Sequence, residues 1–195
     1  MVMQGSVSSA DHFERMREAM RMLRDSEVLV GVPEAKTERR KAKITNAQLL
    51  YIHTHGIRKR SMRKEMDRTM NAGHSYSAAF QMYIMSHGSP LWKAPPRPVL
   101  EPAIDAHKAE IAKQMKDAAT AALGGNEAKA RVALKRAGMV GQNAARSWFT
   151  DQRNGWAPNS PVTIALKGSS RPLIDTGQLR RSIVYVVRKR GGDSD

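Results

Sequence analysis

The 195-residue sequence contains no cysteine, so disulfide bonds and thiolate metal sites are excluded, and folding in a reducing compartment is permitted. Aromatic residues make up only 5% of the chain, whereas there are 12 methionines, which predicts an aliphatic, methionine-rich core with adaptable packing. No stretch approaches about 18 uninterrupted apolar residues, and residues 1–10 lack the basic and apolar regions of a secretory signal. We therefore expect a soluble protein with no membrane partner.

Acidic residues are scarce as well. There are 18 Asp and Glu residues against 33 Lys and Arg, which gives a formal net charge of +15 at pH 7. This imbalance favours an anionic partner, either nucleic acid or an acidic protein surface. Charge alone does not choose between the two.

Two chemistries have no support in the sequence. There is no Gly-x-Gly-x-x-Gly pattern and no Gly-x-x-x-x-Gly-Lys-Ser/Thr pattern, so we expect no glycine loop for a nucleotide phosphate. His53 and His55 are two residues apart on a predicted helix and therefore point away from each other, while His74, His87 and His107 have no partner at ligand spacing. The sequence predicts neither a cofactor nor a metal site.

The apolar residues that are present predict an α+β fold. Residues 27–32 and 183–187 predict two strands, and residues 100–123 and 127–150 predict two long helices, joined as an antiparallel pair by a Gly-Gly-Asn connection. We expect the N- and C-terminal strands to share a small mixed or antiparallel sheet that the long helices cross. Because two strands cannot form a large closed sheet, weaker strands or a neighbouring subunit must complete it.

Each long helix should bury one face. The first helix carries its apolar stripe at Leu100, Ile104, Ile111, Met115, Ala119 and Ala122. The second presents a face of mostly small residues at Ala130, Leu134, Ala137, Gly141, Ala144 and Trp148. Small residues allow helices to pack closely, which supports the antiparallel pair.

Capping residues predict three shorter helices. Ser9 is a possible N-cap for an amphipathic helix with Phe13, Met16, Met20 and Leu23 on one face. Thr45-Asn-Ala-Gln48 matches a capping box, and its helix should end at Gly56 with an inner face of Ala47, Leu50, Tyr51 and Thr54. Ser160 before a proline begins a third helix, which Gly168 ends.

Residues 57–89 are predicted to form an inserted helical excursion. Methionines recur at i, i+4 and i+8 along its first half, a glycine at position 73 interrupts the pattern, and a second helix with inward aromatic residues follows. The methionines are Met62, Met66 and Met70, and the inward residues of the second helix are Tyr76, Phe80, Tyr83 and Ile84. Residues 1–56 and 90–187 then form the main domain, and 188–195 a flexible tail. The excursion is either a small satellite core, or a ring contact or DNA-facing arm.

Basic residues gather in two segments that we predict to be interaction surfaces. The first is an exposed loop over residues 34–43 with Lys36, Arg39, Arg40, Lys41 and Lys43. The second opens the excursion with Arg58, Lys59, Arg60, Arg63 and Lys64. Duplex DNA is a possible partner of both, because phosphate attraction requires charge and no motif.

One segment resembles a catalytic motif. Leu173-Ile-Asp-Thr-Gly177 is similar to the active-site triplet of aspartic proteases, in which paired carboxylates activate water. However, the segments on either side of this motif are expected to be helical, whereas such a protease is rich in β-structure. We favour a structural turn in which Asp175 caps the amides of Gly177 or Gln178 and Gly177 permits a tight bend. We therefore expect no enzymatic activity.

Three blocks together resemble a known family. They are Ile44-Thr-Asn-Ala-Gln-Leu-Leu-Tyr-Ile-His-Thr-His-Gly56, then Ala94-Pro-Pro-Arg-Pro-Val-Leu-Glu-Pro-Ala-Ile104, then Trp156-Ala-Pro-Asn-Ser-Pro161 with Pro172-Leu-Ile-Asp-Thr-Gly-Gln-Leu-Arg-Arg-Ser-Ile183. In this order they are similar to the neck or tail-completion proteins of long-tailed bacteriophages, the phage virion morphogenesis type. The excursion is a departure, since relatives have a much shorter link there.

The resemblance implies a structural virion protein without catalysis. Such a subunit joins the tail to the head in a homo-oligomeric ring, sixfold or twelvefold, around the DNA channel. Its partners would be other neck and tail proteins, such as the connector and the tail tube or terminator, and the DNA in the channel. It would be assembled in the host bacterial cytoplasm and would reside in the neck or tail of the virion. The alternatives are a basic nucleic-acid-binding module and the protease.

Overall fold

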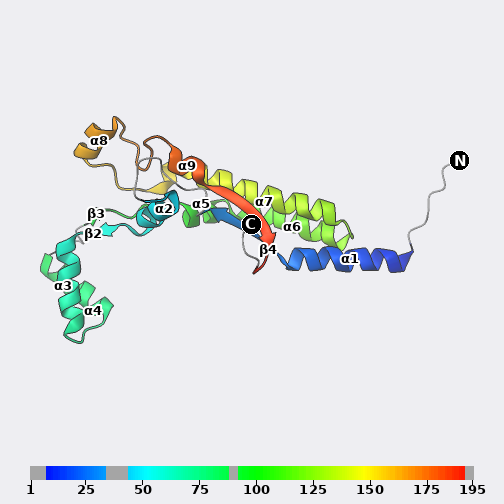
Figure 1. The fold of residues 1–195 in the computed structure, drawn as a ribbon, viewed down its shortest axis with the longest axis horizontal. Coiled ribbons are helices and arrows are strands. Elements are labelled where there is room, and N and C mark those ends of the chain that lie inside the picture. The colour runs from blue at the N-terminus through cyan, green and yellow to red at the C-terminus, as the bar shows by residue number, and fades with distance from the viewer. Residues whose placement is uncertain (1–7, 34–43, 88–91, 192–195) are drawn as a thin grey trace.

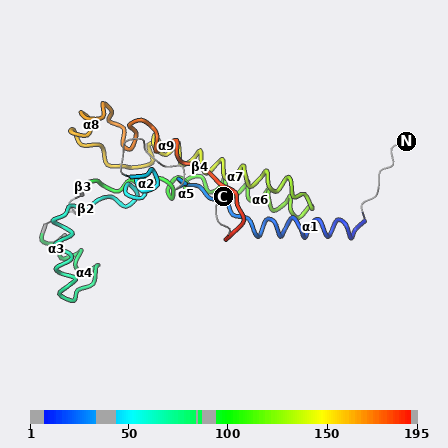
Figure 2. Tube along the Cα trace, viewed as in Figure 1, coloured from blue at the N-terminus to red at the C-terminus, as the bar shows by residue number. Residues whose placement is uncertain are grey.

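The computed structural model describes residues 8–33, 44–87 and 92–191. Its main body is built on helices α5 (Leu100–Ala106), α6 (Lys108–Leu123) and α7 (Glu127–Trp148) and on strands β1 (Ser26–Gly31) and β4 (Val184–Lys189). The molecule is elongated (Figures 1 and 2). Helix α1 (Ser9–Arg24) projects at one end, and the helical hairpin of α3 (Arg60–Asn71) and α4 (Tyr76–His87) lies at the other. None of the described helices is both long and apolar enough to cross a lipid bilayer.

Helices α6 and α7 form the predicted antiparallel pair. Asn126 caps α7 by accepting the amide of Lys129 at 2.9 Å. The small-residue face of α7 is buried as expected, at Ala130, Leu134, Ala137, Gly141, Ala144 and Trp148. The sequence pattern therefore located both the helix and its buried side.

The prediction of one helix over residues 100–123 is wrong in one detail. The chain breaks at His107, which separates α5 from α6. In an uninterrupted helix the amide of His107 would donate to the carbonyl of Ala103, but Nδ1 of His107 lies 2.9 Å from that carbonyl oxygen. The backbone amide donates instead to Ile104, at 3.1 Å. The imidazole thus competes for the carbonyl that the helix needs.

The N- and C-terminal strands share a sheet, as predicted. β1 and β4 pair antiparallel with Leu29 opposite Val186 and Glu27 opposite Arg188. β1 is displaced by one residue from the predicted strand, and β4 runs to Lys189, inside the segment 188–195 that we expected to be a tail. In the part of the chain that the structure describes, no third strand joins this sheet.

Helix α7 covers one face of the sheet, and two glycines bring it close. A Cβ added at Gly138 would lie 2.8 Å from Cγ of Tyr185 on β4, and one at Gly141 would lie 2.9 Å from Cγ2 of Val30 on β1. Real Cβ atoms do not approach other heavy atoms this closely. The absence of side chains at these positions therefore fixes the distance between helix and sheet.

Helix α1 is only partly supported by the main body. Its N-cap is Ser8, which accepts the amide of Asp11 at 3.2 Å, and not Ser9. Ala19 is buried and Leu23 is half-buried, but Phe13 is 55% exposed and Met20 is 38% exposed. The prediction that both residues pack inward is wrong. Phe13 lies on the first half of α1, which extends past the end of the α6–α7 hairpin (Figure 1), and Met20 lines an open hollow beside β1.

The capping box that begins α2 (Asn46–His55) is confirmed, since the side chains of Thr45 and Gln48 each accept the other's backbone amide. Leu50 is buried, but Tyr51 is 67% exposed, so its predicted inward position is wrong. Gly56 then leads into β2 (Ile57–Arg58), which pairs with β3 (Trp92–Ala94) in a short antiparallel ribbon. This ribbon was not predicted.

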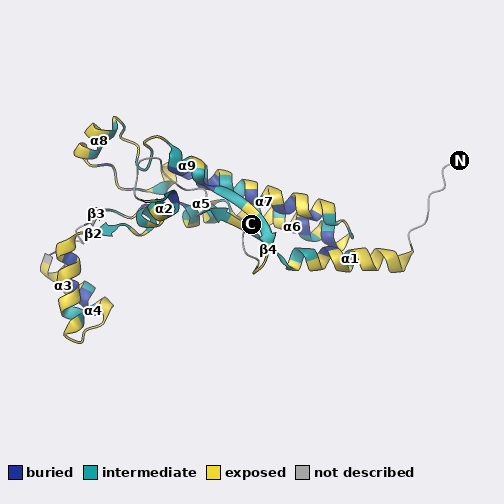
Figure 3. Cartoon of the chain, viewed as in Figure 1, coloured by how far each residue is buried: buried dark blue, intermediate teal, exposed yellow. Residues whose placement is uncertain are grey.

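The excursion is a helical hairpin with its own small core, as the methionine stripe indicated. Met62, Met66, Ala79 and Tyr83 are buried together, and Met70 and Phe80 pack against them. Tyr76, which we expected inside, is 52% exposed. Figure 3 shows that the buried residues of α3 and α4 lie only where the two helices face each other.

The remaining elements lie between α7 and β4. They are the 3-10 turn η2 (Gln152–Asn154), α8 (Pro161–Lys167) and α9 (Gln178–Ser182). Ser160 caps α8 and Gly168 ends it, as predicted. Leu179 of α9 joins the largest core cluster with Leu50, Val99, Trp148 and Ile183. This cluster attaches α2 and the proline-rich segment to the end of α7.

The close approach of α7 to the sheet makes a prediction. Gly138→Ala should lower the free energy of unfolding by about 1–2 kcal/mol, because overpacking against Tyr185 outweighs the higher helix propensity of alanine. Chemical denaturation would measure the change. Gly124→Ala is the matched control, since its Cβ would meet atoms only at 3.5 Å or more. Equal stability of the two variants would contradict the packing described here.

Candidate functional site

The candidate residues from the sequence belong to three segments of the chain. The basic loop with Lys36, Arg39, Arg40, Lys41 and Lys43 lies outside the described residues. The other basic residues lie at the base of the hairpin, and the Asp175 turn lies at the end of the main body. Among the described residues, the basic residues of the hairpin and the Asp175 turn therefore do not form one site.

Arg58 does not face solvent as an interaction residue would. Its guanidinium lies over the rings of Tyr76 and Phe80, with centroid distances of 5.3 and 5.2 Å, and its Nη1 contacts the hydroxyl of Tyr76 and the sulfur of Met66. Cation–π contacts of this kind stabilise a partly buried guanidinium. Arg58 therefore joins the β2–β3 ribbon to the hairpin.

The other four basic residues of this segment are exposed. Lys59, Arg60, Arg63 and Lys64 occupy the N-cap and first two turns of α3, and we call them the α3 basic face. The first turn of α3 contains no acidic residue. Positive charges at a helix N-terminus are unfavourable, because the helix dipole is also positive there. This surface is suited to an anionic partner.

The Asp175 turn has a different hydrogen-bond pattern from the one predicted. The hydroxyl of Thr176, and not the carboxylate of Asp175, accepts the amide of Gln178 at 3.3 Å. The prediction for Gly177 is confirmed, since its φ of +73° lies in the left-handed region. Arg181 donates to the carbonyl of Thr176 at 2.9 Å and closes the turn. Asp175 remains exposed.

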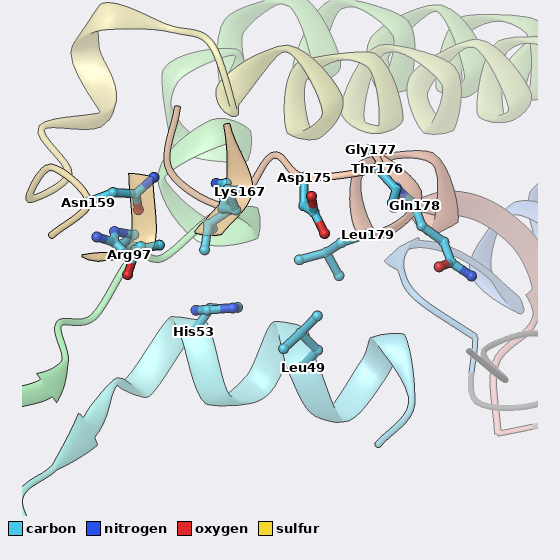
Figure 4. Close-up of a pocket in the computed structure, with 12 residues that line it drawn as sticks. Leu49, His53, Arg97, Asn159, Lys167, Asp175, Thr176, Gly177, Gln178 and Leu179 are labelled. Carbon is cyan, nitrogen blue, oxygen red and sulfur yellow. The ribbon is translucent and has the colours of Figure 1, made fainter. Parts of the chain in front are cut away.

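A cavity of about 250 Å³ lies beside this turn, and we call it the junction cavity. Its walls come from α2, the proline-rich segment, α8 and the turn before α9 (Figure 4). Arg97 and Asn159 lie at one end, Asp175 lies towards the other, and Lys167 lies between them (Figure 4). Of the described residues that line it, Asp175 is the only acidic one. One chain therefore supplies no carboxylate pair here.

Arg97 is the most buried of these charges, with 7% of its surface exposed. Its Nε and Nη2 donate to the carbonyl of Ala157 at 3.1 and 2.8 Å, and Nη2 also donates to Pro158 at 3.1 Å. Burial lowers the pKa of the guanidinium from its usual value. Arg97 thus connects the segment before α5 to the loop after α7.

Lys167 is the second cation of the cavity. Its Nζ donates to the carbonyl of Arg171 at 2.7 Å. Burial lowers the pKa of Lys167, the nearby charge of Arg97 lowers it further, and the carboxylate of Asp175 opposes both effects. The cavity therefore holds two partly desolvated cations.

Within the described part of the chain, the sheet has an exposed apolar face. On the side away from α7, Leu29 is 41% and Val186 is 39% exposed, and with Val184 they form what we call the outer sheet face. Beside β1, a hollow of about 750 Å³ is lined by Val28 and Val30 of the strand and by Ile104, Ile111 and Met115 of α5 and α6. We call it the β1 groove. Neither surface was apparent from the sequence.

The two ends of the molecule also carry exposed apolar side chains. Phe13 lies on the projecting half of α1, and Val162 and Leu166 of α8 are 69% and 85% exposed. Helices α1 and α8 lie at opposite ends in Figure 1. Val162 and Leu166 are four residues apart on α8 and therefore lie on the same side of that helix, whereas a single exposed apolar residue such as Phe13 is normal on a protein surface.

Comparison with known proteins identifies no relative: no protein-family model, no curated protein sequence and no solved structure matches the chain. Among the described residues, no group of three or more His, Cys, Asp or Glu side chains could hold a metal ion.

Sequence reasoning did not identify the junction cavity. Arg97 was noted only within the Pro-Arg-Pro entry to a helix, and its hydrogen-bond acceptors lie 60 and 61 residues away. The available signal was an arginine between two prolines in an extended segment. Such an arginine does not belong to the solvent-facing side of a helix, so its side chain could pack against another part of the chain. Its partners could not be inferred from spacing.

The contacts of Arg58 predict its effect on the hairpin. Arg58→Gln should destabilise α3 and α4 by about 1 kcal/mol, because the cation–π contacts are lost. The backbone amides of these helices should then exchange roughly fivefold faster. Hydrogen exchange followed by mass spectrometry would measure this. Arg63→Gln makes the same change on the exposed side of α3 and should leave exchange unaltered. Equal exchange in both variants would show that Arg58 does not hold the hairpin.

Proposed function

We propose that this chain is a structural subunit of a tailed-bacteriophage particle that assembles into a ring at the junction of head and tail, around the DNA channel. The likeness of three sequence blocks to neck and tail-completion proteins suggests this role. The observation that carries the proposal is the incompletely covered sheet of β1 and β4. Its neighbours in the ring would be further copies of the chain, with the connector and the tail tube or terminator on either side.

A two-stranded sheet is rarely stable by itself, and α7 covers only one of its faces. The outer sheet face and the β1 groove leave apolar side chains in water, where their burial against a partner would be favourable by about 25 cal/mol per Å². Natural proteins usually protect exposed strand edges. A second copy of the chain would cover these surfaces, which supports a subunit of an assembly.

The open surfaces also favour a ring over a symmetric dimer. The projecting half of α1 with Phe13, the outer sheet face and α8 with Leu166 lie on different parts of the molecule. A contact between two different surfaces is heterologous, and repeated heterologous contacts form either a closed ring or an open filament. A ring is the form that a neck requires.

The charge of the chain is consistent with a position beside DNA. The net charge is +15, and the α3 basic face presents four cations on a helix that extends from the main body (Figure 1). Near packaged DNA such a surface would attract phosphate, or it would bind an acidic ring above or below. The same observation favours the second candidate, a basic nucleic-acid-binding module that does not assemble.

The proposal predicts a large native mass for the purified protein. Light scattering across a range of protein and salt concentration should detect a six- or twelve-subunit species. Val186→Glu should shift this species towards monomer, because the charge would be buried at the outer sheet face. Val132→Glu is the matched control, since Val132 is similarly exposed, at 48%, but lies on the solvent side of α7. It should leave the ring intact.

Other outcomes would favour the alternatives. A monomer at every concentration would contradict self-assembly of the chain, and salt-dependent binding of short duplex DNA by that monomer would favour the nucleic-acid-binding module. A tight dimer with a peptide-cleaving activity that Asp175→Asn abolishes would favour the protease. If the Val186→Glu variant still formed the ring, the outer sheet face would not be part of the subunit interface.

A further inference from the structure

The junction cavity contains more positive than negative charge. Arg97 and Lys167 both line it, and Asp175 is the only acidic residue among the described ones that do. No ion pair joins Asp175 to either cation, since neither Arg97 nor Lys167 has a carboxylate oxygen within 4.0 Å in the described chain. The carboxylate influences Lys167 only from a distance.

Arg97 is the cation of the cavity whose surroundings are best suited to an anionic ligand. Buried charges in proteins are normally paired, because removing a charge from water is costly. The acceptors of Arg97 are the neutral carbonyls of Ala157 and Pro158, which satisfy hydrogen bonds but leave the charge uncompensated. They occupy Nε and Nη2, so Nη1 retains its donors. The guanidinium is therefore fixed in place, and no hydrogen bond from a described residue occupies Nη1.

The other polar groups of the cavity agree with this arrangement. Asn159 is 8% exposed and is fixed by donation from its Nδ2 to the carbonyl of Ser170 at 3.1 Å. Lys167 is fixed through its contact with Arg171, and His53 of α2 lies across the cavity from it (Figure 4). The basic end is thus built from side chains whose positions are set by backbone contacts.

We propose that the junction cavity binds an oxyanion, a carboxylate or phosphate group, between Arg97 and Lys167. Its volume of about 250 Å³ accommodates one such group. The group is either a free phosphate ion or the carboxylate of an acidic side chain from a bound protein. This site is separate from the ring proposed above and would exist in a monomer.

Two variants should change anion binding in opposite directions. Isothermal titration calorimetry with inorganic phosphate, in chloride buffer of constant ionic strength, measures the affinity. Lys167→Gln should weaken phosphate binding by about tenfold or more, because a charge-assisted hydrogen bond is lost. Asp175→Asn should strengthen it, because a repelling carboxylate is removed while the turn keeps its Thr176 and Arg181 contacts.

Lys113→Gln is the matched control, since Lys113 is exposed on α6 and the change in net charge is the same. It should bind phosphate as the unaltered protein does. A parallel titration with acetate separates the two sources of the oxyanion, because tighter acetate binding indicates a carboxylate ligand and tighter phosphate binding indicates phosphate.

Some results would overturn the site. If neither phosphate nor acetate binds, or if Lys113→Gln weakens binding as much as Lys167→Gln, the cavity is not an oxyanion site. Should Lys167→Gln fail to fold, Asp175→Asn still decides the matter, since unchanged or weaker phosphate binding in that variant would contradict the proposal.

Discussion

Small residues on α7 let the helix backbone lie directly against the sheet of β1 and β4. Gly138 faces Tyr185, and Gly141 faces Val30, each at a distance that no side chain would permit. This contact joins two strands far apart in the sequence to the longest described helix, and α6 and α1 also pack against α7. It uses one face of the sheet only, and in the part of the chain that the structure describes the outer sheet face stays exposed and the β1 groove stays open beside β1.

Local signals were enough to predict much of the fold. Three of these signals are the cap at Asn126, the capping box at Thr45 and the methionine stripe of the hairpin. Each involves residues only a few positions apart, so the interactions that form the helix can be recognised in the sequence. The pairing of β1 with β4 followed from two apolar runs. The ribbon of β2 and β3 did not, because strands of two and three residues are too short to show a period.

The misplaced predictions share a cause. Phe13 and Tyr51 lie on faces that look apolar in sequence, but their surroundings are set by where α1 and α2 extend from the body. The break at His107 depends on a ring nitrogen that reaches its own helix, and the role of Arg97 depends on carbonyls some 60 residues away. Such contacts exist only after folding. The candidate site was therefore less predictable than the fold.

The proposed ring requires a neighbouring copy to complete the sheet. Hydrogen exchange of the amides of β1 and β4 tests this most directly, compared between a dilute sample and a concentrated, assembled one. We expect the strand amides not used between β1 and β4 to be protected on assembly, while those of α3 and α4 keep their rates. Unchanged exchange along both strands, in a sample whose mass shows it to be assembled, would contradict the claim.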